Sequence, residues 1–108
     1  MVDADNNIAF YMGDDGTPGC IYKFVPTAKY NPTNRAANVN LLDDGILYAA
    51  KFKEDGEGEW VALVHGQNGL TVGAVDPGNT TRNPATGAGT LNFTSQADVL
   101  IDTKGAAR

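Results

Sequence analysis

The stretch Phe10–Pro26, FYMGDDGTPGCIYKFVP, indicates the fold because two segments of alternating apolar residues flank a glycine-rich turn. The first segment places Phe10 and Met12 on one face of a strand, and the second strand is expected over residues 20–25. The turn GDDGTPG contains residue types that tolerate positive φ or fix a turn, which predicts an antiparallel hairpin. Its adjacent carboxylates, Asp14 and Asp15, fit either a polar hairpin loop or part of a metal site.

Two further alternating segments follow this hairpin and extend the predicted sheet. Pro26 ends the second strand, because proline cannot donate to a ladder, and residues 27–40 form a polar connection. Residues 46–52, ILYAAKF, and 60–64, WVALV, then read as a third and a fourth strand. The charged run between them, KEDGEGE at 53–59, is expected to be a solvated hairpin tip. We therefore predict a four-stranded β region over residues 1–65.

The last 43 of the 108 residues have a different character. Residues 66–93 are rich in glycine, threonine and asparagine, which predicts a long loop. Loops longer than about 12–15 residues are uncommon in a compact domain unless they are functional or supported by a larger assembly. Ser95 can cap a helix together with Asp98, and apolar residues then recur at helical spacing, so we expect a helix from about 95 to 107 within the terminal segment 94–108. The chain is mainly β and forms a single domain or a fragment of one.

Composition limits the partners of such a chain. Its 108 residues include 13 acidic and 8 basic side chains, which gives a formal charge of -5. A net anion disfavours nucleic acid and anionic membranes, whereas divalent cations suit its surface. The N-terminal sequence MVDADNN lacks the basic and apolar regions of a signal peptide, and no apolar run is long enough to cross a bilayer. We therefore expect no nucleic-acid partner and no membrane partner.

Several residue types that often carry chemistry have simpler interpretations here. The segment beginning at Asp3 resembles the start of an EF-hand loop, but Ile8 occupies the position that requires glycine, so we reject that motif. Cys20 lies in the same alternation as the apolar residues of its strand and is expected to be a small buried hydrophobe. His65, the single histidine, is expected to be a solvated turn residue. Asp43-Asp44-Gly45 is expected to be a turn before the third strand.

A series of short motifs, in order along most of the chain, resembles the PhoX-type bacterial alkaline phosphatases. The motifs are YMGDD (11–15), IYKFV (21–25), LDDGILYAAKF (42–52), GEGEW (56–60) and FTSQADVLIDTK (93–104). None of these pieces is specific by itself. Their order and spacing over about nine tenths of the chain make chance a poor explanation.

The resemblance implies a β-propeller enzyme that hydrolyses phosphate monoesters with Fe³⁺ and Ca²⁺. It also implies export by a twin-arginine signal, and hence a periplasmic or extracellular location. The four predicted strands would be the outer part of one blade and the start of the next, which corresponds to about one blade plus a strand. In such a propeller, Asp14 or Asp15 would face the metal centre or orient one of its ligands.

Three departures from the family limit what the chain itself is expected to do. The family's metal-ligand motifs, a cysteine followed by two glutamates, a His-Glu-Asn and an Arg-Pro-Glu, do not occur in the sequence. Lys104 stands where an arginine is usual, and the glycine-rich stretch 73–89 is longer than the family norm. We therefore assign no catalytic or cofactor-binding residue, give Cys20 no metal role, and do not expect the chain alone to hold a full metal cluster.

Two functions remain open at this point. The chain is either a segment of a PhoX-like phosphomonoesterase that is inactive in isolation, or a free-standing propeller-derived β module with a binding or assembly role. A module of the second kind would expose strand edges and could form homo-oligomers through them.

Overall fold

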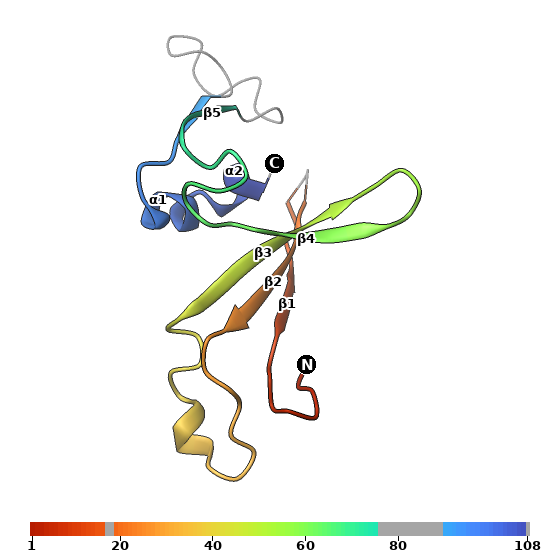
Figure 1. Cartoon of the computed structure of the whole chain (residues 1–108), viewed down its shortest axis with the longest axis vertical. Coiled ribbons are helices and arrows are strands. Elements are labelled where there is room, and N and C mark those ends of the chain that lie inside the picture. The colour runs from red at the N-terminus through yellow and green to blue at the C-terminus, as the bar shows by residue number, and fades with distance from the viewer. Residues whose placement is uncertain (17–18, 76–89, 108) are drawn as a thin grey trace.

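The computed structural model describes residues 1–16, 19–75 and 90–107. Its main element is a four-stranded sheet in which each strand pairs antiparallel with the next one in sequence. The strands are β1 (Phe10–Gly13), β2 (Ile21–Pro26), β3 (Gly45–Phe52) and β4 (Gly58–Ala62), shown in Figure 1. The prediction of a mainly antiparallel β chain with four strands before residue 65 is therefore confirmed in its outline.

The register of the strands separates two faces of this sheet. Phe10 pairs with Phe24, which pairs with Leu47, and these residues lie on one face. Tyr22 and Ala49 lie on the same face and are buried. Because side chains alternate along a strand, the neighbouring residues point to the opposite face.

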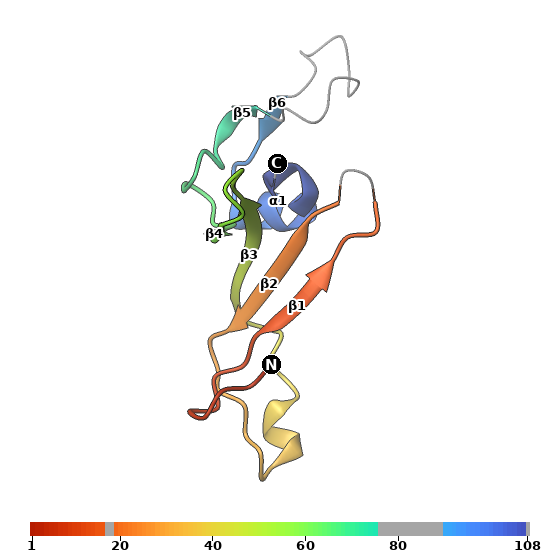
Figure 2. The same ribbon diagram turned by 90° about the vertical axis from the view of Figure 1, so that its right-hand side faces the viewer.

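The hydrophobic core lies between the first of these faces and the C-terminal part of the chain. Tyr22 and Ala49 belong to one cluster with Leu63, Phe93 and Val99, of which Phe93 and Val99 are almost fully enclosed. Figure 2 shows the helices beside one end of the sheet, whereas the N-terminus and the short 3-10 helix η1 (Arg35–Asn38) lie at the other end. The core therefore supports only part of the sheet.

Cys20 packs against this cluster as a partly buried residue. The expectation of a small buried hydrophobe is therefore confirmed in part, because Cys20 packs on the core but is only partly buried.

The prediction of a loop over residues 66–93 is wrong in part, because this segment contains two short strands. β5 (Val72–Val75) and β6 (Thr90–Asn92) pair antiparallel in a separate two-stranded sheet. Their register shifts between Val72 and Ala74, at Gly73, whose φ is +81°. A glycine bulge of this kind breaks the alternation that would identify a strand in the sequence. Residues 76–89, which hold most of the glycine-rich stretch, lie outside the described residues.

The single helix predicted over 95–107 is observed as two, α1 (Gln96–Ile101) and α2 (Thr103–Ala107). The predicted cap is confirmed, because the Ser95 hydroxyl accepts the N–H of Asp98. Asp102 interrupts the helix: its carboxylate accepts the N–H of Gly105, and the hydroxyl of Thr103 donates to the carbonyl of Leu100. Short polar side chains compete in this way for backbone groups that would otherwise continue the helix.

The two charged turns are found as expected. Lys53 and Glu57 close the β3–β4 hairpin through a backbone hydrogen bond of 2.8 Å and an exposed ion pair of 3.8 Å. Asp43 and Asp44 are exposed and directly precede β3. Both turns are solvated connections between strands.

Candidate functional site

The two predicted metal ligands lie in the loop of the β1–β2 hairpin. The N–H of Asp14 donates to the carbonyl of Cys20 over 2.9 Å, and its Oδ1 accepts the N–H of Gly16, also over 2.9 Å. Asp14 is half-buried, whereas Asp15 is exposed. In Figure 2 this loop lies at the same end of the molecule as the helices. These contacts are those of a hairpin turn, and the metal role of either residue stays a prediction.

The carboxylates of this loop offer oxygen donors, which suit hard cations such as Ca²⁺. Within residues 1–16, 19–75 and 90–107, no group of three or more His, Cys, Asp or Glu side chains is placed to hold a metal ion. Among the described residues, Asp14 and Asp15 therefore do not belong to a group of side chains that could hold a metal ion.

The acidic segment that begins at Asp3 is folded into a local turn. Oδ1 of Asp3 accepts the N–H groups of Asp5 and Asn7, and Oδ2 accepts the side-chain amide of Asn7 over 2.8 Å. These bonds, above all the one from the Asn7 side chain, hold the pKa of the Asp3 carboxyl below its ordinary value. The Asp3 carboxylate therefore stabilises this local turn.

His65 lies in a turn, as the sequence suggested, but it is not solvated. Its side chain is half-buried, and Nε2 lies 3.0 Å from the carbonyl oxygen of Phe93, to which it donates. The backbone N–H of His65 donates to Oε1 of Gln96, and the Gln96 amide donates to the carbonyl of Leu63. The histidine thus fixes the end of the sheet to the start of α1. Its partners are about 30 residues away, so local pattern could not reveal this role.

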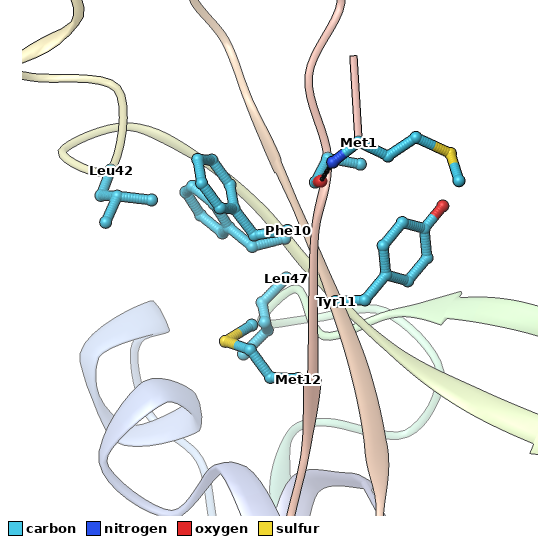
Figure 3. A pocket seen from close by; sticks show the side chains of 8 residues that line it. Met1, Phe10, Tyr11, Met12, Leu42 and Leu47 are labelled. Carbon is cyan, nitrogen blue, oxygen red and sulfur yellow. Dashed lines mark hydrogen bonds between the residues drawn. The ribbon is translucent and has the colours of Figure 1, made fainter. Parts of the chain in front are cut away.

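A second feature that the sequence analysis missed is an apolar pocket of about 670 Å³ on the side of the sheet that carries Phe10 and Phe24. Its lining residues are Met1, Ala9, Phe10, Tyr11, Met12, Phe24, Leu42 and Leu47 (Figure 3). The terminal ammonium of Met1 donates to the carbonyl of Ala9 over 2.8 Å. A phosphate ester requires cationic groups or hydrogen-bond donors directed at it, so this pocket does not suit phosphate.

A third feature is a cluster of aromatic residues around a cation on the opposite face of the sheet. The Lys23 ammonium lies 4.9 Å from the ring centroid of Tyr48 and 4.8 Å from that of Trp60. Tyr11 adds a tilted ring contact with Trp60 at a centroid distance of 5.8 Å. Each of the four strands β1 to β4 supplies one of these side chains.

Comparison with known proteins places this arrangement of sheet and short helices among the alkaline phosphatases. Residues 1–108 match the family model described as alkaline phosphatase PhoX. The chain belongs to the PhoX family, as its sequence motifs indicated. No curated protein gave a significant match.

A solved structure supports the same assignment. The chain is similar to Pseudomonas fluorescens PhoX, solved in complex with vanadate, a transition state analogue. The two share 35% sequence identity with a TM-score of 0.73 over 99% of this chain. The chain spans 17% of the length of that protein. The fold of this chain therefore corresponds to one part of a PhoX structure.

Proposed function

We propose that this chain forms part of a PhoX-type phosphomonoesterase. The observation that carries the proposal is the match of all but 1% of the chain, at 35% identity, to a PhoX structure that holds vanadate. Vanadate mimics a phosphoryl group in transfer, so the substrate class proposed for the whole enzyme is a phosphate monoester. The chain supplies scaffold to this reaction, because the described residues include no complete metal site.

The proposed setting is a β-propeller. A propeller blade is a four-stranded antiparallel sheet, and β1 to β4 form one such sheet with neighbouring strands in sequence order. We therefore place all four strands in one blade, and β5 would begin a neighbouring one. This placement keeps the expected one blade plus a strand of the next, with β5 as that strand.

The proposed metal ions are Fe³⁺ and Ca²⁺, with Asp14 or Asp15 as a ligand or as a partner that orients one. Such ions stabilise the charge of a transferring phosphoryl group and activate its nucleophile. Residues of this chain would hold one oxygen donor in place through the hairpin turn at Asp14. The family also implies a periplasmic or extracellular enzyme. None of the helices among the described residues has the length and apolar character needed to cross a membrane.

A chimera tests the proposal: P. fluorescens PhoX in which this chain replaces the matching segment. Asp14→Asn and Asp15→Asn are made singly, and Asp43→Asn serves as the control because Asp43 lies in a comparable acidic turn. We expect one of the first two variants to lose most of its turnover of a chromogenic phosphate monoester and part of its bound iron or calcium. Full activity and metal content in both would refute the assignment of a metal role to this hairpin.

The isolated chain provides a second measurement. With Fe³⁺ and Ca²⁺ added, it is expected to show no turnover, because two neighbouring carboxylates cannot hold a multi-ion centre. Turnover by the isolated chain would contradict the view that the remaining ligands come from elsewhere.

A second candidate function is a free-standing binding or assembly module. The observation that favours it is that β1 and β4 are the outer strands of the sheet, so each has one edge that no strand of the described chain covers. Open edges of this kind pair with other chains. Light scattering at high protein concentration should then show dimers, and a monomer under these conditions would count against this function.

A further inference from the structure

One face of the four-stranded sheet is apolar and lies open. We call it the aromatic face and define it by six residues: Tyr11, Ile21, Lys23, Tyr48, Phe52 and Trp60. Strand pairing places Tyr11 beside Lys23 and Lys23 beside Tyr48, and the other three follow by alternation. Phe52 is 68% exposed and Tyr11 is 51% exposed. A shallow hollow of about 290 Å³ between Tyr11, Ile21, Phe52 and Trp60 marks the surface.

The opposite face of the same sheet is also apolar, because it carries Phe10, Phe24 and Leu47 and contributes Tyr22 and Ala49 to the core. An antiparallel sheet with one solvated face usually alternates apolar and polar residues, whereas a sheet covered on both sides is apolar throughout. The composition of the aromatic face is therefore that of a surface that packs against another layer. Rings of this size also dominate the energetics of buried interfaces.

Lys23 indicates the chemistry of the covering layer. Its ammonium rests over the Tyr48 and Trp60 rings, at 4.9 and 4.8 Å from their centroids. The ion pairs found among the described residues are Lys51 with Glu59 and Lys53 with Glu57, and neither involves Lys23. When a second layer excludes water from this face, an ammonium group requires a charged or hydrogen-bonding partner. A carboxylate from that layer would meet this need.

The relative of known structure has ample polypeptide to provide the layer. This chain corresponds to 17% of P. fluorescens PhoX, so most of that protein lies outside the matched part. A second copy of this chain suits the face less well, because each copy carries a net charge of -5 and two such anions repel each other. Stacked sheets pack about 10 Å apart, which suits the flat arrangement of these side chains.

We propose that the aromatic face is an interface within the whole PhoX protein, covered by a β segment from outside this chain that brings a carboxylate to the Lys23 ammonium. The proposal rests on membership of the PhoX family and on the exposed face. It does not depend on a metal role for Asp14 or Asp15.

Oxidative footprinting read by mass spectrometry tests the location of the interface. Tyr11, Phe52 and Trp60 are compared between the isolated chain and the chimera in P. fluorescens PhoX. Their oxidation is expected to be several-fold slower in the chimera, whereas Val39, 80% exposed in the connection before β3, changes little. Equal oxidation of the three rings in both proteins would overturn the proposal.

The isolated chain alone can also refute it. If the covering layer comes from elsewhere, the three rings are oxidised at the same rate in dilute and in concentrated solutions of the isolated chain. Protection that appears with rising concentration would identify a second copy as the partner and overturn the proposal, whether or not the chimera folds.

A matched pair of variants tests the carboxylate. Lys23→Met keeps the length of the side chain and removes its charge, and Lys51→Met does the same in the neighbouring strand, where Lys51 pairs with Glu59 on the other face. We expect Lys23→Met to lower the Tm of the chimera by several degrees and that of the isolated chain by much less, because only the chimera leaves a carboxylate without its partner. Lys51→Met should change the Tm of the chimera and that of the isolated chain by similar amounts. Equal Tm shifts for Lys23→Met in the two proteins would contradict the predicted ion pair. Neither readout requires enzymatic activity, so a failed metal assignment at the hairpin would leave these results interpretable.

Discussion

Replacing Gly45 with alanine is expected to lower the free energy of unfolding of the chain by about 2–3 kcal/mol, the upper part of the usual range for overpacking. A Cβ atom at this position would lie 2.5 Å from the carbonyl oxygen of Val25 and 2.6 Å from Cζ of Phe24. It would also lie 2.9 Å from Cα of Pro26, which pairs with Gly45 at the start of β3. Two of these three atoms belong to the backbone of β2. They cannot move aside without disturbing the ladder between β2 and β3, so we expect little relief from relaxation.

Urea unfolding followed by circular dichroism measures this effect. With a slope of roughly 1–2 kcal/mol per molar urea for a chain of this size, the midpoint should fall by about 1–3 M. Gly13→Ala is the control, because Gly13 also lies in the sheet but has no atom within 4 Å of an added Cβ and no positive φ. The control should leave stability unchanged or raise it by up to about 1 kcal/mol. Gly45→Ala with the same midpoint as the wild-type chain would refute the close approach of β3 to β2.

Three further changes probe the C-terminal part of the fold. Phe93→Ala empties a core position that is 2% exposed and should cost about 3–5 kcal/mol in urea unfolding, whereas Phe52→Ala, at a position that is 68% exposed, should cost much less. Gln96→Ala removes two hydrogen bonds to backbone groups of Leu63 and His65, just after β4, and should cost about 1–2 kcal/mol and speed amide exchange there. The hydroxyl of Thr94 and its N–H both donate to Asp98, and they hold the pKa of that carboxyl below the ordinary value of 3.8. This carboxylate therefore stabilises the fold above pH 3.8 and ceases to do so as the pH falls through its lowered pKa, so the urea midpoint should drop on acidification, and less so in Asp98→Asn.

The sheet could be predicted from the sequence because its determinants are local. Each hairpin consists of period-2 apolar segments around a turn with glycine or aspartate, and these signals fix both the strands and their antiparallel order. Gly45 illustrates the limit of such reasoning. The sequence predicted a turn at Asp43-Asp44-Gly45, but the steric need for glycine arises from β2, which lies 20 residues earlier in the chain.

The sequence predictions that were wrong concern features that depend on contacts formed only in the folded chain. The strands β5 and β6 are held by each other across the intervening chain, and a bulge at Gly73 removes the alternation that would have revealed them. The break between α1 and α2 depends on side-chain bonds of Asp102 and Thr103, which apolar spacing does not register. His65 gains its role from Phe93, a contact that exists only after the chain has folded. In each case a tertiary or side-chain interaction outweighs the local pattern.

The distribution of charged and apolar groups also bears on the role proposed for this chain. Its carboxylates lie mainly in turns, where Asp3, Asp14 and Asp55 accept backbone N–H groups within their own loops. Both faces of the sheet carry large apolar side chains, and only one end of one face is covered by the core. Catalysis of phosphoryl transfer requires several cationic centres held rigidly around one point, and rigidity comes from packing. A layer packed on the aromatic face would stiffen the sheet that carries the acidic hairpin. The interface at the aromatic face and the proposed metal role of the hairpin would then be linked, since a variant that opens the interface should weaken metal binding at Asp14.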